Sequence, residues 1–263
     1  MQSSSHLELS RLGLNLNRSS WIILAITTLA ELSLIFANPS WSLVLHIVLI
    51  IFIIFVSVSE PEDSPVYRYY ISLLLIPLIR ILSLALPLAA WSQATWYAAV
   101  SIPLFVTMFI LTRRFAFTRI DLALGDFNPW HQFAIALVGI PLGLTEYLIL
   151  TPAPLIPTLT WELAWFPALI LMVSTGFLEE LLFRGLLQKT SLTLFSPTIS
   201  LLFVSTLFAV LHIGYASLAD VAFVFSAGLL FGIIVYRTNS LLGVTIAHGL
   251  TNIGLFIFWP FVL

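Results

Sequence analysis

Long apolar runs separated by short polar clusters make up most of this chain. A helix needs about 20 mainly apolar residues to cross a bilayer core of about 30 Å. Nine runs meet that length, over residues 21–37, 41–59, 69–91, 95–112, 129–151, 162–188, 197–213, 219–236 and 240–261. The runs are continuous rather than alternating, which argues against membrane-spanning strands. The pattern therefore predicts an all-α, polytopic transmembrane helix bundle of about nine spans, or eight if the first two runs form a hairpin.

The composition agrees with lipid as the main solvent. Of the 263 residues, 60% are hydrophobic and 8% are charged, whereas about a quarter of the residues in a soluble domain are charged. The formal net charge of -2 leaves no basic face for nucleic acid, so we expect no nucleic-acid partner. The chain has no cysteine, which excludes disulfides, thiolate metal sites and a cysteine nucleophile.

Basic residues fall in alternate loops. They precede the first run or follow the second, fourth, sixth and eighth runs: Arg11, Arg18, Arg68, Arg113, Arg114, Arg119, Lys189 and Arg237. Cytoplasmic loops are enriched in Lys and Arg. The asymmetry therefore predicts a multi-pass membrane protein with residues 1–20 as a cytoplasmic N-terminal tail, in the plasma (inner) membrane if the chain is bacterial.

Three groups of polar residues interrupt the last apolar runs. They are Glu179, Glu180 and Arg184; Phe208 and His212; and His248 and Asn252. Charged side chains within a span cost a few kcal/mol on insertion scales, so each suggests a function. Glu180 and Arg184 are four residues apart and can pair on one helix face, whereas Glu179 is rotated by about 100° and left free. The structural alternatives are an ion pair, interhelical hydrogen bonds and a polar packing seam.

The depth of these residues in the bilayer links the three groups. At a rise of about 1.5 Å per residue, Glu179 lies roughly 15 Å from Lys189, and His212 roughly 22 Å from the start of its run. His248 and Asn252 lie roughly 17 and 23 Å from Arg237 on the same measure. Polar side chains at similar depth on neighbouring helices are expected to line one water-accessible cavity.

The motifs Glu-Glu-x-x-x-Arg, Phe-x-x-x-His and His-x-x-x-Asn, in this order, resemble those of the CPBP family, which includes CAAX prenyl proteases and bacteriocin-processing or self-immunity proteins. The resemblance covers roughly residues 129–263, a protease-like core, whereas residues 21–128 carry no recognised motif. It implies a metal-free intramembrane endopeptidase acting on a membrane-associated peptide or protein, lipidated or not. By the same resemblance, Glu179 would be the general base and His212 would hold the attacking water. His248 and Asn252 would stabilise the oxyanion, Glu180 and Arg184 would fix the helix geometry, and Phe208 would pack.

Other chemistries are open to the same residues. Glu179, His212 and His248 could be the three protein ligands of a catalytic zinc. No His-Glu-x-x-His helix is present, however, and the resemblance implies a metal-free protease. We therefore expect no cofactor and favour the metal-free mechanism over zinc. Ser205 and Ser226 lack a motif context. A non-catalytic scaffold or self-immunity protein is the main rival. A proton-coupled transporter ranks last, because the chain shows no paired repeats.

Three further charged residues lie within the first five runs, Glu31, Arg80 and Glu146, and His46 lies there as well. Arg80 is expected to pair with one of the two glutamates across the bundle. A structural ion pair is the favoured interpretation of this second group, ahead of a second polar path.

Overall fold

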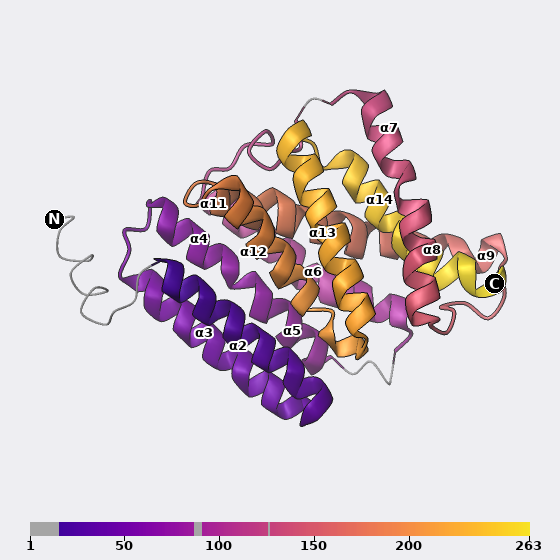
Figure 1. Ribbon diagram of the computed structural model, residues 1–263, viewed down its shortest axis with the longest axis horizontal. Helices are drawn as coiled ribbons and strands as arrows, with labels where there is room; N and C mark the ends of the chain where they lie inside the picture. Colours follow the sequence, from indigo (N-terminus) through magenta and orange to yellow (C-terminus); the bar gives the residue numbers. More distant parts are fainter. Residues whose placement is uncertain (1–15, 87–90, 126) are drawn as a thin grey trace.

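The computed structural model describes residues 16–86, 91–125 and 127–263 (Figure 1). Within these ranges the chain is helical, and an isolated bridge between Leu124 and Ser240 is the one extended pairing. Nine helical spans of the described part are long and apolar enough to cross a membrane. The all-α bundle is therefore confirmed, and α2 and α3 each form a separate span.

The first five spans are α2 (Leu16–Phe36), α3 (Pro39–Val58), α4 (Pro65–Leu73) with α5 (Leu75–Ala85), α6 (Gln93–Arg114), and α7 (Pro129–Leu137) with α8 (Gly139–Leu150). The sixth joins α9 (Trp161–Ile170), η2 (Leu171–Phe177), α10 (Leu178–Glu180), η3 (Leu181–Leu187) and α11 (Gln188–Leu192). The last three are α12 (Pro197–Val210) with η4 (Ile213–Tyr215), α13 (Leu218–Thr238), and α14 (Leu242–Ile253) with η5 (Gly254–Phe258) and η6 (Trp259–Phe261).

Most boundaries lie within a few residues of the predicted ones. The first helix begins at Leu16, five residues before the predicted start, and residues 1–15 of the predicted tail lie outside the described residues. The third span covers Pro65–Ala85 instead of 69–91, and residues 87–90 again lie outside the description. The earlier start of the third span reflects its N-cap Ser64, which the apolar run does not contain.

A repeated Asn-Pro or Ser-Pro pair starts four of the spans. Asn38, Ser64, Asn128 and Ser196 are N-caps whose side chains accept hydrogen bonds from backbone N–H groups of the first turn. In each case proline follows as the first helical residue. The cap satisfies free N–H groups, and proline lacks the N–H that would otherwise be unpaired. The turn clusters of the sequence therefore set where these spans begin.

The bundle is apolar outside and partly polar inside. Large side chains such as Phe36, Ile51 and Trp130 are exposed on its surface. Charged side chains such as Glu31 and Glu180 have no exposed area. A soluble protein shows the opposite distribution of charge, so the outer surface suits lipid and the interior holds the polar chemistry.

Small residues bring α14 close to its neighbours. A Cβ atom on Gly143 of α8 would lie 2.7 Å from the Thr251 carbonyl oxygen, and one on Gly176 of η2 would lie 2.8 Å from the Thr245 carbonyl oxygen. Close backbone approach at glycine is typical of packed membrane helices. In Figure 1, α12, α13 and α14 occupy the middle of the molecule, with α2 and α3 at one side and α7 to α9 at the other.

Candidate active site

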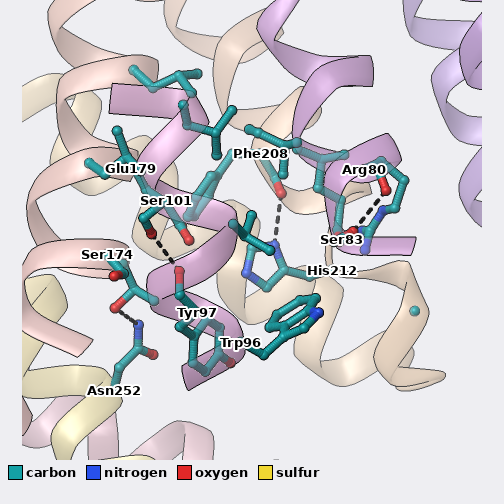
Figure 2. Close-up of a pocket in the computed structure, with 18 of the residues that line it drawn as sticks. Arg80, Ser83, Trp96, Tyr97, Ser101, Ser174, Glu179, Phe208, His212 and Asn252 are labelled. Atoms are coloured by element: carbon teal, nitrogen blue, oxygen red, sulfur yellow. Dashed lines mark hydrogen bonds between the residues drawn. The ribbon is translucent and has the colours of Figure 1, made fainter. Parts of the chain in front are cut away.

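A cavity of about 490 Å³ lies between α5, α6, the sixth span, the end of α12 and α14. Its lining includes the four side chains predicted to be catalytic, Glu179, His212, His248 and Asn252, as their similar depth in the bilayer predicts. In Figure 2, Glu179 and Asn252 lie on one side of the cavity, and His212 lies on the other.

The two adjacent glutamates have different surroundings. Glu180 has no exposed area, and its Oε1 lies 2.8 Å from Nη1 of Arg184. Nη2 of Arg184 donates to the Gly228 carbonyl of α13 at 3.0 Å. The side chain of Glu179 is 30% exposed and faces the cavity. The Glu180–Arg184 ion pair predicted from the spacing is thus present, and it holds the sixth span against α13.

His248 joins both glutamates. Its Nδ1 lies 2.8 Å from Oε1 of Glu180, and its Nε2 lies 3.8 Å from Oε2 of Glu179. A carboxylate can only accept, so Nδ1 of His248 donates to Glu180. The contact with Glu180 was not expected from the sequence, where Glu180 has the role of a partner for Arg184 alone. The ring of His248 is consequently fixed with Nε2 toward Glu179.

His212 lies beyond the end of its helix. The seventh span reaches Tyr215, close to the predicted end at residue 213, but its α-helical part α12 ends at Val210, and His212 lies in the turn before η4. Its Nδ1 still donates to the Phe208 carbonyl at 2.9 Å, because a carbonyl oxygen can only accept. In a neutral ring, Nε2 then carries the lone pair. Nε2 has no hydrogen-bond partner among the described residues and is not a buried atom, so it is open to the cavity.

Asn252 is oriented by a residue that the sequence analysis did not single out. Its Nδ2 donates to Oγ1 of Thr175 at 2.8 Å. Thr175 donates in turn to the Leu171 carbonyl at 2.5 Å. One amide hydrogen of Asn252 is therefore engaged with η2, and the other remains available to a ligand in the cavity. No motif in the sequence marks Thr175, because its contact with Asn252 spans 77 positions.

Phe208 packs against the polar groups, as predicted. Its ring centroid lies 4.6 Å from the guanidinium carbon of Arg184, 4.9 Å from the His212 ring and 5.9 Å from the His248 ring. A cation over an aromatic face is attracted by the ring quadrupole. Phe208 therefore separates the buried ion pair from His212.

The second polar group extends to the same cavity. Nη2 of Arg80 lies 2.7 Å from Oε2 of Glu31, so Glu31 rather than Glu146 is its partner. His46 Nε2 lies 3.2 Å from Oε1 of Glu31. Arg80 and Glu146 both line the cavity. The sequence-based pairing is confirmed for Glu31, but the shared cavity was not predicted.

The geometry of the candidate zinc ligands can be compared with a metal site. Catalytic zinc usually binds three protein side chains. Among the residues that the structure describes, no group of three or more His, Asp or Glu side chains is placed to hold a metal ion. Glu179, His212 and His248 line one cavity without forming such a group.

Comparison with known families gives one match. Residues 160–254 match the family model described as type II CAAX prenyl endopeptidase Rce1-like. This region is about a third of the chain and is narrower than the 129–263 of the resemblance. It contains all seven motif residues, from Glu179 to Asn252. Comparisons with curated proteins and with solved structures found no match.

The family match supports a membrane endopeptidase in general terms, and a peptidase acts on a peptide or protein. Nine apolar helical spans in the described part fit an integral membrane protein. Residues 160–254 of this chain are similar to the Rce1-like family, in agreement with the resemblance to the CPBP family.

Proposed function

We propose that the chain is an intramembrane endopeptidase in which Glu179 activates a water molecule, without a metal ion, to hydrolyse a peptide bond of a membrane-associated substrate. The observation that carries the proposal is the division between the two glutamates. Glu180 is engaged by Arg184 and His248, whereas Glu179 faces the cavity. A carboxylate that is not committed to a buried ion pair is the one able to exchange a proton with a ligand.

The reaction is assigned to the residues as follows. Glu179 takes one proton from water as the water oxygen attacks the scissile carbonyl carbon, and Nε2 of His212 accepts a hydrogen bond from the other O–H group, which stays on that oxygen. Glu179 then transfers the proton to the amine nitrogen as the carbon–nitrogen bond breaks. The products are a new carboxyl group and a free amine, so no other reactant is required.

Oxyanion stabilisation is assigned to His248 and Asn252. Donors aimed at the developing oxyanion often contribute the largest catalytic effect. Asn252 has a free amide hydrogen, because the other is bonded to Thr175. His248 can donate from Nε2 only if its ring is also protonated there, since Nδ1 already donates to Glu180. The charges of Glu179, Glu180, Arg184 and protonated His248 then cancel, which suits a site inside a bilayer.

The orientation of the chain is part of this proposal. The positions of the Lys and Arg residues support a cytoplasmic N terminus. We propose a membrane-associated peptide or protein, lipidated or not, as the substrate.

Hydrolysis by the purified protein tests the proposal. The protein would be reconstituted in liposomes with a library of quenched fluorescent, lipid-anchored peptides, and the products identified by mass spectrometry. We expect wild type and Glu162→Gln, a change at an exposed glutamate, to cleave, and Glu179→Gln to be inactive. Folded wild-type protein that cleaves no peptide would favour the non-catalytic scaffold. Proton-coupled uptake in the same liposomes would favour a transporter.

A further inference from the structure

Arg80 of α5 is a charged group that the proposed chemistry does not use. It lies outside residues 160–254, which match the family. Nevertheless it lines the cavity, and its side chain is 17% exposed. Among the described residues of the lining, it is the one Lys or Arg. A guanidinium group is always charged and suits carboxylate binding. Its position beside the site therefore suggests a role in ligand binding.

One edge of the Arg80 guanidinium is fixed by the protein. Nε donates to Oε1 of Glu31 at 2.7 Å, and Nη2 donates to the Leu211 carbonyl at 2.5 Å. Glu31 has no exposed area, and its Oε1 also lies 3.2 Å from Nε2 of His46. These contacts hold the guanidinium in one orientation next to the turn that contains His212. A binding group held in this way loses little conformational entropy when a ligand arrives.

The other edge of the guanidinium is free. Nη1 of Arg80 has no hydrogen-bond partner in the described part of the chain, and it is not among the buried unpaired atoms. Nη1 is therefore an accessible atom of a residue that lines the cavity. Two N–H donors of a fixed cation face a space surrounded by protein and lipid, where an electrostatic interaction is stronger than in water.

The polar groups are distributed unevenly around the cavity. Figure 2 shows Arg80 on the side of His212, across from Glu179 and Asn252. The remaining acidic residue of the lining, Glu146, comes from α8, which packs against α14, and it also lines a smaller pocket with both His212 and Asn252. Glu179 and the guanidinium thus lie on opposite sides of the cavity. One edge of the guanidinium is paired with Glu31, and its other edge can attract a negatively charged ligand group.

We propose that Nη1 of Arg80 binds a carboxylate of the substrate, in a subsite next to the proposed catalytic groups. This inference rests on the proposed function, and it makes Arg80 a specificity-determining residue. The carboxylate is either the free C terminus of the peptide or the side chain of an Asp or Glu. A charged group that enters the bilayer needs an opposite charge, and a charge-assisted hydrogen bond to a guanidinium satisfies this need.

Matched peptides test the proposal. The first pair is a lipid-anchored fluorescent peptide with a free C terminus and the same peptide with a C-terminal amide. The second pair is amidated and carries Asp or Asn at one internal position. For each pair, kcat/KM and Kd are measured and expressed as the ratio of charged to neutral peptide. For wild type we expect a ratio of about ten to a hundred in one pair, as for a hydrogen bond to a charged group.

The test variant is the double change Glu31→Gln with Arg80→Gln, because removal of Arg80 alone would leave Glu31 buried and unpaired. Its matched control is Glu62→Gln with Arg114→Gln, which removes an exposed ion pair away from the cavity. We expect the ratio to fall to about one in the first double variant and to be unchanged in the control. A loss of folded protein, or a shift of His212, lowers the rates for both peptides of a pair and cancels in the ratio.

If the test variant does not fold, Arg80→Lys keeps the charge but lacks Nη1, and we expect a reduced ratio. A wild-type ratio of one for both pairs, or a ratio that survives in the test variant, would overturn the inference. The pair that shows the preference identifies the source of the carboxylate. Binding without hydrolysis, with the Kd ratio lost in the test variant, would support the subsite and contradict the protease. Hydrolysis without a preference for the charged peptide of either pair would support the protease and contradict the subsite.

Discussion

Nδ1 of His248 lies 2.8 Å from Oε1 of Glu180, and the same oxygen lies 2.8 Å from Nη1 of Arg184. One buried carboxylate thus holds together the sixth and ninth spans. The neighbouring Glu179 makes no side-chain hydrogen bond among the described residues, lies 3.8 Å from Nε2 of His248, and faces the cavity. Two adjacent glutamates are therefore expected to respond differently to the same substitution.

Glu180→Gln should destabilise the protein more than Glu179→Gln. Removal of one partner from a buried ion pair leaves an uncompensated charge and costs about 3–5 kcal/mol. The free energy of unfolding, measured by denaturant titration in mixed micelles, checks this expectation. Glu179→Gln is the matched control, and we expect its stability to be close to that of wild type. Equal losses in the two variants would show that Glu180 is not the structural member of the pair.

Gly176→Ala should also lower the free energy of unfolding. The added Cβ would lie 2.8 Å from the Thr245 carbonyl oxygen and 3.0 Å from the Gly249 nitrogen, so η2 and α14 would have to separate. Overpacking of this kind typically costs about 1–3 kcal/mol. Gly214→Ala is the comparison, because its Cβ would meet Leu34 at 3.7 Å, an ordinary contact. The same denaturant titration serves, and a Gly176→Ala variant as stable as Gly214→Ala would refute the close approach.

Much of the bundle was predictable because a bilayer imposes simple rules on sequence. Spans must be long and apolar, so all nine were found from hydrophobicity. The Glu180–Arg184 pair followed from helical spacing. By contrast, the contacts of His248 with Glu180 and of Arg80 with Leu211 connect positions 68 and 131 residues apart. Hydrophobic periodicity does not specify which helices are neighbours, so these contacts were not accessible from the sequence.

The end of α12 is the main local difference. The apolar run continues through residue 213, but the helix stops at Val210. Arg80 binds the Leu211 carbonyl, and Ala216 adopts a left-handed conformation with φ 56°. A distant arginine thus satisfies a carbonyl oxygen that a longer helix would have satisfied itself. A span predicted from local hydrophobicity alone cannot include that contact.

His212→Ala should reduce kcat without a comparable loss of stability. Nε2 of His212 has no hydrogen-bond partner among the described residues, so its assigned partner is the attacking water. Loss of a group that assists proton transfer commonly lowers the rate by about 10²- to 10⁴-fold. Steady-state kinetics with the best peptide of the library gives kcat and KM separately. A raised KM with unchanged kcat would place His212 in substrate binding instead.

Removal of metal ions should leave hydrolysis unchanged. Glu179, His212 and His248 do not form a three-ligand group in the described structure, and the proposed reaction uses the protein's own side chains. Activity would be compared before and after dialysis against EDTA and 1,10-phenanthroline, with metal content measured on the same samples. If activity were lost on dialysis and restored by added zinc, the attacking water would be bound to zinc, and the metal-free role of Glu179 would be contradicted.

The role of Glu179 is tested most directly by single-turnover hydrolysis of one lipid-anchored peptide by wild type and Glu179→Gln, with Kd measured for both. We predict a rate constant at least about 10²-fold lower in the variant, with an unchanged Kd and an unchanged free energy of unfolding. A Glu179→Gln variant that cleaves the peptide at the wild-type rate would contradict the account.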